Sequence, residues 1–230
     1  MLQQTVEVDV VLKKVASEIV VQGENLRAKV RDLTLQALQG RELSLAGIKQ
    51  VLKSVAEGVN IGAAKARIDV EKPLADALAG MDDALLKVVH ASQMALDRLL
   101  DHGADFQDSR IRKALGDLDN LEDEFLKIVK QSAEAASKQV KAQWEGVFAH
   151  MPAGGTGAGA RAEAVAATFA ELMRIAMHKQ RDGAAKATHL LVQNYGTLAS
   201  GILIGLSEGL RGEGVRAKAT RAKPRKAARA

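Results

Sequence analysis

The sequence predicts an all-α protein: an elongated antiparallel bundle of about five long amphipathic helices with a disordered basic C-terminal tail. Three observations support this prediction. Alanine is the commonest of the 230 residues, aromatic residues make up only 3%, and apolar residues recur every three to four positions over long stretches. A thin aliphatic core of this kind favours helices packed closely on helices over a β-sandwich or a wound sheet.

The first predicted helix ends before Gly40 and has an apolar stripe along its length. Four members of the stripe are spaced one heptad apart: Leu12, Ile19, Leu26 and Leu33. Gly23 lies in the middle, where a glycine loosens or breaks a helix. Residues 5–11 alternate β-branched and acidic side chains, as a strand does, but the stripe continues at helical spacing and we therefore predict a helix.

Two further helices follow. Ser44, a residue type that favours the N-cap position, opens the second. Asp69 and Pro73 mark the start of the third, because proline is tolerated in a first turn. The third helix has the most regular pattern, with apolar residues in alternating steps of three and four from Leu74 to Leu99.

The fourth predicted helix begins at a cap formed by Asp108 or Ser109 and continues through Trp144 to His150. About 40 residues at 1.5 Å each extend roughly 60 Å, a length typical of a rod-shaped bundle. We therefore assign residues 1–151 to a helical bundle.

The rest of the chain divides by composition. Residues 152–160 are rich in Gly and Ala and predict a flexible linker. Residues 161–210 predict a long helix that crosses Gly183 and packs on the bundle. From 211 to 230 the composition changes to Ala, Arg, Lys and Pro without an apolar period, which is typical of a disordered tail.

Positive charge is concentrated in this tail. Its eight basic residues and one acidic residue give +7, whereas the whole chain carries +5, so residues 1–210 carry −2. The predicted polyanion-binding residues are Arg211, Arg216, Lys218, Arg221, Lys223, Arg225, Lys226 and Arg229. Such cations displace counterions from a phosphate backbone without reading its sequence, and no aromatic residue among them offers base stacking. An anionic surface, an acidic protein, or no specific partner are the alternatives for the tail.

Two glycine-containing segments are similar to each other. Residues 54–62 and 197–205 share the pattern Ser/Thr–aliphatic–Ala–x–Gly–aliphatic–x–Ile–Gly. Glycines four apart lie on one helix face and let another backbone approach closely. The predicted helix-contact residues are Gly58, Gly62, Gly201, Gly205 and Gly209. We interpret them as a tight crossing inside the protein, for example of these two segments; self-association and insertion into a lipid or polymer surface are alternatives.

No group of residues predicts catalysis. The chain has no cysteine, and none of its five histidines forms the i, i+4 pair of a helical metal site. The acidic stretch 117–124 has Leu121 where a calcium loop needs Asp or Asn, so it predicts a solvated helix face. The glycines of residues 154–159 lack the spacing of a phosphate-binding loop. We therefore predict a protein that is not an enzyme, with no cofactor, no metal and no small-molecule substrate.

The sequence also bears on localisation. Its first residues have no secretory signal pattern. Residues 190–207 come nearest to a membrane span, but they include several polar side chains and are short for a bilayer. Together with the absence of cysteine, these features predict a cytoplasmic protein, with granule or nucleoid association as a further expectation.

Two segments resemble an uncharacterised bacterial family of alanine-rich helical proteins: residues 74–85 (LADALAGMDDAL) and residues 201–209 (GILIGLSEG). This resemblance covers most of residues 1–210 and implies no function. More loosely, the long Ala-rich amphipathic helices and basic terminus are similar to phasins, which coat polyhydroxyalkanoate granules. Some phasin-like proteins carry a basic tail that binds the nucleoid, so this likeness implies a granule surface and DNA as partners.

The function we expect is non-catalytic. The chain is a helical scaffold or a phasin-like protein at a granule surface, and its tail binds DNA or another polyanion. The expected partners are further copies of the chain, a polyanion, and an apolar granule or membrane surface. The alternative is an oligomeric coiled-coil adaptor whose tail only aids solubility and has no nucleic-acid role.

Overall fold

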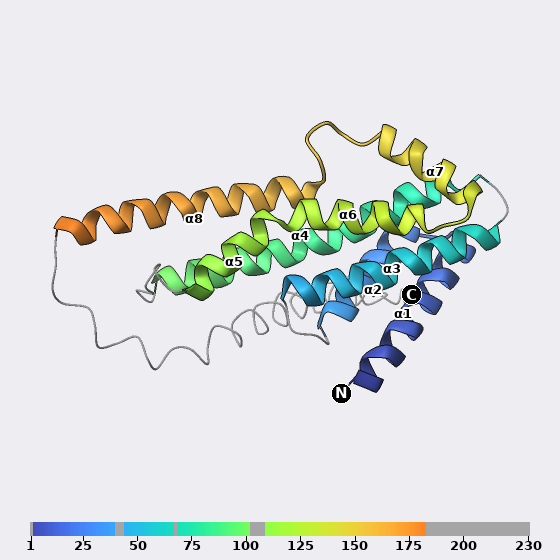
Figure 1. The fold of residues 1–230 in the computed structure, drawn as a ribbon, viewed down its shortest axis with the longest axis horizontal. Helices are drawn as coiled ribbons and strands as arrows, with labels where there is room; N and C mark the ends of the chain where they lie inside the picture. Colours follow the sequence, from blue (N-terminus) through green and yellow to red (C-terminus); the bar gives the residue numbers. More distant parts are fainter. Residues whose placement is uncertain (1, 40–43, 67–68, 102–108, 183–230) are drawn as a thin grey trace, which may run out of the picture.

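The computed structural model of the chain describes residues 2–39, 44–66, 69–101 and 109–182. These described residues form helices and no strand, which confirms the all-α prediction (Figure 1). Their helices are α1 (Leu2–Gln22), α2 (Leu26–Gln39), α3 (Leu45–Ala66), α4 (Glu71–Asp101), α5 (Ser109–Asp119), α6 (Leu121–Glu134), α7 (Lys138–Ala149) and α8 (Gly157–Asp182). In the elongated bundle, α3, α4, α5, α6 and α8 follow the long axis, and α1 and α7 lie toward one end (Figure 1).

The first predicted helix is two helices, α1 and α2. Gly23 has φ +72° and Asn25 has φ 49°, so the backbone is in the left-handed region at both residues. Glycine reaches this region without strain and asparagine tolerates it, and a helix ends there. The turn separates the two halves, so that α1 packs mainly on α3 and α2 packs mainly on α4.

The predicted starts of α3 and α4 are confirmed. The Ser44 hydroxyl oxygen accepts a hydrogen bond from the Gly47 N–H at 3.2 Å, which is an N-cap contact. The Asp69 carboxylate accepts from the Glu71 N–H at 3.1 Å, and Pro73 lies in the first turn of α4.

The fourth predicted helix, expected to continue over about 40 residues, is wrong in its length: the chain forms α5, α6 and α7 instead. At the first break, the Gly116 carbonyl accepts from the Asn120 side chain at 2.6 Å as well as from the Asn120 backbone N–H at 3.1 Å, and Asn120 has ψ 0°. At the second, Ser137 has ψ 152° and its hydroxyl oxygen accepts from the Val140 N–H, which starts α7 in a new direction.

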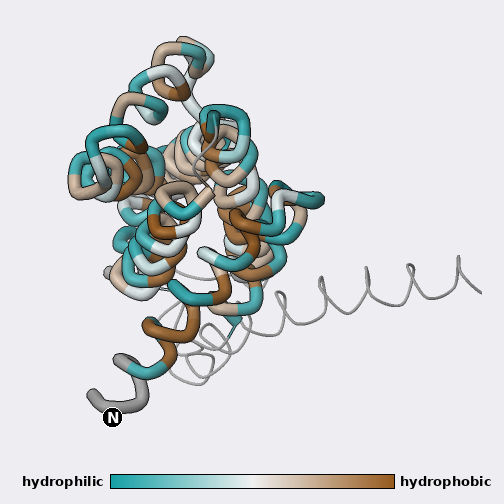
Figure 2. The backbone as a smooth tube through the Cα atoms, turned by 90° about the vertical axis from the view of Figure 1, so that its right-hand side faces the viewer, coloured by the Kyte–Doolittle hydropathy of each residue, from teal (hydrophilic) through white to brown (hydrophobic). Residues whose placement is uncertain are grey.

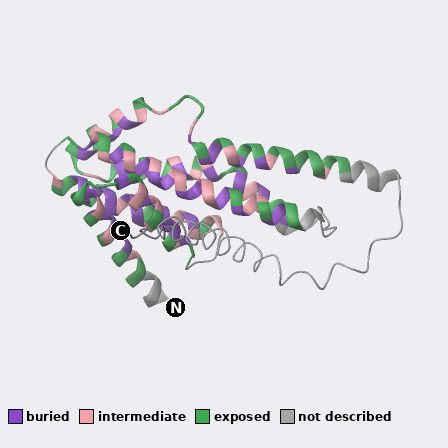
Figure 3. Cartoon of the chain, turned by 180° about the vertical axis from the view of Figure 1, so that it is seen from behind, coloured by how far each residue is buried: buried purple, intermediate pink, exposed green. Residues whose placement is uncertain are grey.

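The core contains few aromatic side chains. Trp144, Phe125 and Phe169 are its largest fully buried residues, and the rest is mainly Leu, Val and Ala. Buried positions lie on the inner sides of the bundle helices, while the outer side of α8 is exposed (Figure 3). Because the chain changes direction before α7, Trp144 lies in this core, with 1% of its surface exposed.

Candidate functional site: glycine crossings and the docking of α8

Two of the predicted helix-contact glycines lie where α3 meets α1. A Cβ atom built on Gly58 would be 2.5 Å from the Lys13 carbonyl oxygen, and one on Gly62 would be 2.6 Å from the Ser17 carbonyl oxygen. Neither position has room for a side chain without backbone movement. Residue numbers rise together along the two helices, so α1 and α3 run parallel at this crossing.

The remaining predicted contact glycines, Gly201, Gly205 and Gly209, lie outside the described residues. The partner of Gly58 and Gly62 among the described residues is α1. Pairing between segments 54–62 and 197–205 stays a prediction.

A third close crossing joins α4 to α2 at Gly80, which is not among the predicted helix-contact residues. A Cβ atom on Gly80 would be 2.5 Å from the Arg27 carbonyl oxygen and 3.0 Å from the Val30 Cβ. The signal was present in the sequence, because Ala77, Gly80 and Ala84 are small residues at spacings of three and four, and all three are buried.

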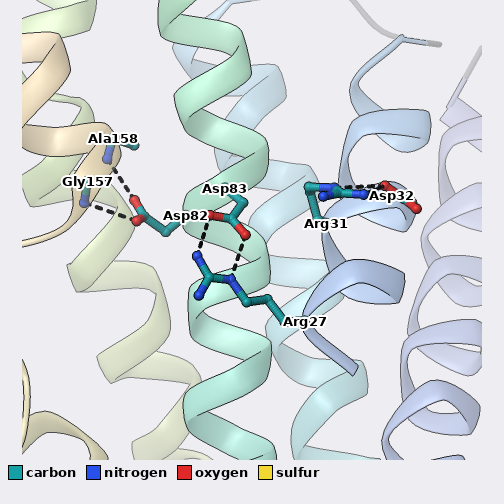
Figure 4. Close-up of polar contacts among 7 residues, drawn as sticks. All are labelled: Arg27, Arg31, Asp32, Asp82, Asp83, Gly157 and Ala158. Atoms are coloured by element: carbon teal, nitrogen blue, oxygen red, sulfur yellow. Dashed lines mark hydrogen bonds and ion pairs between the residues drawn. The ribbon is translucent and has the colours of Figure 1, made fainter. Parts of the chain in front are cut away.

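Next to this crossing, two adjacent carboxylates on α4 bind different helices (Figure 4). Asp83 accepts two hydrogen bonds from the Arg27 guanidinium of α2, from Nε at 2.6 Å and from Nη2 at 2.7 Å. These hydrogen bonds lower the pKa of Asp83 despite its partial burial, and they raise the pKa of Arg27. The pair is bidentate, which fixes the orientation of α2 on α4.

Asp82 binds the N-terminus of α8 on the other side (Figure 4). Its carboxylate accepts from the backbone N–H groups of Gly157 at 3.0 Å and Ala158 at 2.8 Å. The first N–H groups of a helix have no partner within the helix and carry partial positive charge, so a carboxylate is a favourable acceptor there. Asp82 therefore docks α8 on α4.

Glu122 of α6 completes this docking through Thr156. The Thr156 N–H donates to Glu122 at 2.8 Å and its hydroxyl donates to the same carboxylate at 2.5 Å. The Thr156 hydroxyl oxygen also accepts from the Gly159 N–H at 3.1 Å, as an N-cap residue does. The Glu122 carboxylate fills the space that a side chain at Gly155 or Gly159 would need.

These contacts correct one prediction and extend another. Residues 152–160 were expected to be a flexible linker, but α8 begins at Gly157 and the glycines admit the Glu122 carboxylate. The stretch 117–124 was expected to be a solvated helix face; it lies in α5 and α6, and in addition Glu122 holds Thr156 and Glu124 pairs with Lys49 of α3 at 2.7 Å. The hydrogen bond from Lys49 lowers the pKa of Glu124.

A buried polar network joins α3, α6 and α7. The Asn60 amide nitrogen donates to the Ser132 carbonyl oxygen at 2.7 Å and to its hydroxyl oxygen at 2.8 Å. The Trp144 indole N–H donates to the Asn60 side-chain oxygen at 2.7 Å. Because Asn60 pairs with both Ser132 and Trp144, the network specifies how these helices pack. The sequence gives little sign of this network, since Asn60 stands there within the glycine pattern of residues 54–62.

The described residues contain no group of three His, Cys, Asp or Glu side chains that could hold a metal ion. Among the same residues, no helix is long and apolar enough to cross a membrane. All eight predicted polyanion-binding residues of the tail lie outside them. The contacts that the structure brings together thus hold helices to one another.

The fold and these contacts define the class: an all-helical bundle assembled through glycine crossings and carboxylates that bind neighbouring helices. The chain belongs to a family of unknown function (DUF6781), whose model matches residues 1–212. This confirms the resemblance to an uncharacterised family, while the likeness to phasins stays a prediction. The matched range includes α1 to α8 and only the first of the eight tail cations. Neither a curated protein nor a solved structure matches the chain.

Proposed function

We propose that the protein is a non-catalytic helical scaffold whose C-terminal tail binds DNA through the phosphate backbone. The observation that supports this proposal is the separation of charge along the chain. Residues 211–230 carry +7 and residues 1–210 carry −2, so attraction to a polyanion is concentrated in one short segment.

The helices α1 to α8 support the scaffold part of the proposal for a different reason. The Asp83, Glu124 and Asp82 carboxylates hold α2, α3 and α8 to their neighbours, so these groups are used for packing. Seven of the tail cations lie beyond the residues that the family model matches. The DNA-binding proposal therefore concerns this chain and extends no function to the family.

A gel-shift experiment with mixed-sequence duplex DNA tests the tail. If all eight cations contact phosphates, the logarithm of the binding constant falls with the logarithm of salt concentration with a slope of about −7. Affinity should then drop by roughly 10³ to 10⁵ between 50 and 200 mM salt. Deletion of residues 211–230 should remove binding.

Two tail variants serve as controls. Replacing the eight cations with Gln keeps the length and should abolish binding, whereas a scrambled tail of the same composition should bind as the natural one does, because the interaction reads charge only. Binding that survives the deletion or the Gln variant would rule out the tail as the DNA-binding segment. No binding by the unmodified chain would favour the adaptor with a solubilising tail.

Association of the body with an apolar granule is a second candidate. One observation favours it: Leu172 and Ile175 near the described end of α8 are 36% and 40% exposed. A fluorescent fusion should collect at polymer inclusions, and L172Q/I175Q should disperse it. Diffuse fluorescence of the unmodified fusion in polymer-rich cells would contradict this candidate.

A further inference from the structure

The outer face of α1 carries exposed apolar side chains. Val10, Val11 and Val21 are 60%, 59% and 53% exposed, whereas Leu12 and Ala16 on the opposite face are buried against the bundle. Valine is a weak helix former, so exposed valines contribute little to an isolated helix. The first turns of α1 project from the bundle with apolar residues among them (Figure 2), and no described helix covers their outer side (Figure 1).

Two opposite charges lie on the same face as these valines. Lys14 and Glu18 are exposed. Neither has an ion-pair partner among the described residues. Residues 11, 14, 18 and 21 follow one another at steps of three, four and three, which is the spacing of a coiled-coil seam. The face thus has an apolar residue at each end and a charge of each sign between them.

We propose that this face binds a second copy of the same chain, with the two α1 helices packed antiparallel about a two-fold axis level with residue 16. In this register Val11 of one copy lies opposite Val21 of the other, and Lys14 lies opposite Glu18. Two-fold symmetry repeats each contact, which gives two valine pairs and two opposite-charge pairs. Parallel pairing in register would instead place Lys14 against Lys14 and Glu18 against Glu18.

The chemistry of the face also predicts the strength of the dimer. A single pair of helices buries a small interface, so the dimer should dissociate on dilution. The central Lys–Glu pairs specify register and orientation, while the valines supply apolar burial. The proposal is independent of the tail, because α1 carries the whole surface.

Sedimentation equilibrium of the full chain, treated with nuclease, tests this surface across a range of protein concentrations. The unmodified chain should form a dimer that dissociates on dilution. K14E places two glutamates opposite each other in each pair, and E18K places two lysines opposite each other, so each variant alone should weaken the dimer by at least about tenfold. A mixture of the two variants should form a heterodimer, because every pair then has opposite charges.

Two matched substitutions separate this surface from general effects. V11A/V21A should weaken the dimer without lowering the melting temperature, because alanine is the better helix former. V8A removes an exposed valine outside the seam, and K113E reverses an exposed lysine on α5; both should leave the dimer unchanged.

Several outcomes would overturn the proposal. A full chain that is monomeric at all concentrations would mean that no second copy binds this face. A dimer that persists unchanged in both K14E and E18K would place the interface elsewhere. Failure of the mixed variants to pair, after each alone has become monomeric, would rule out the antiparallel register.

Discussion

Gly58 and Gly116 are both helical glycines, yet their surroundings give them opposite roles. Gly58 faces the Lys13 carbonyl at the α1–α3 crossing, whereas a Cβ atom on Gly116 of α5 would meet nothing within 4 Å. Glycine costs backbone entropy in any helix, so it is useful only where close approach is needed. At Gly58 the close helix contact therefore outweighs the entropic cost of glycine. At Gly116 no such contact offsets that cost.

Substituting alanine at these two positions should change stability in opposite directions. G58A should lower the free energy of unfolding by about 1–3 kcal/mol, because the added methyl group pushes α1 away. G116A should raise it by about 0.4–1 kcal/mol through the unfolded state. Denaturant unfolding followed by the fluorescence of Trp144 measures both; equal effects of the same sign would contradict the assignment.

Asn60 is the residue on which the buried polar network depends. N60L should lower the free energy of unfolding by about 1–3 kcal/mol, since it leaves the Trp144 N–H and the Ser132 hydroxyl without their partner. W144F should cost less in the N60L background than in the natural chain. Circular dichroism during denaturant unfolding provides the measurement, because W144F removes the fluorophore, and additive costs would mean that the two groups are not coupled.

Among the elements, α8 shows how a segment with linker-like composition can be held at a defined place. Its first turn consists of small residues whose N–H groups have no acceptor within the helix. Asp82 of α4 accepts from Gly157 and Ala158, and Glu122 of α6 accepts from the preceding Thr156. Farther along, Ala162, Val165 and Phe169 are buried. Docking thus combines polar contacts at the N-terminus with an apolar stripe.

Removal of the Asp82 carboxylate should loosen α8 selectively. D82A should cost about 0.5–2 kcal/mol, the usual range for a lost N-terminal cap. Hydrogen exchange in residues 157–170 should quicken, while α3 stays protected. D76A removes an aspartate of the same helix that pairs with Lys72, four residues earlier, and it should leave exchange in α8 unchanged. Equal exchange in both variants would argue against docking by Asp82.

At the scale of the whole molecule, ion pairs that join helices make stability depend on pH. Folding lowers the pKa of Asp83, so the Arg27 pair stabilises the native state above the ordinary carboxyl value near 4. That stabilisation is lost as pH falls through the lowered pKa. Because Arg27 is largely exposed, the pair contributes no more than about 1 kcal/mol.

Comparison of the natural chain with D83N measures this contribution. Between pH 6 and pH 2 the natural chain should lose more of its free energy of unfolding than D83N does, by up to about 1 kcal/mol. As pH falls through the lowered pKa of Asp83 and its carboxyl becomes protonated, the two proteins should approach the same stability. A difference that grows toward low pH would contradict the sign of the pKa change.

The sequence by itself determined the helical class and the starts of α3 and α4, because the apolar period and the residues Ser44, Asp69 and Pro73 act through neighbours within a turn or two. It also identified Gly58 and Gly62 as residues with a close neighbour, from their spacing. The breaks at Asn120 and Ser137 were missed, since the apolar stripe continues past both and only local backbone angles and side-chain hydrogen bonds mark them.

Only the tertiary structure decided which groups meet. Asp82 and Asp83 look alike in the sequence, but adjacent positions on a helix point about 100° apart, so one binds α8 and the other α2. The glycines at 155 and 159 predict flexibility until the Glu122 carboxylate, more than thirty residues away in the chain, fills the space beside them. The apolar period depends on residues close together in the chain, whereas these contacts depend on how helices distant in the chain cross.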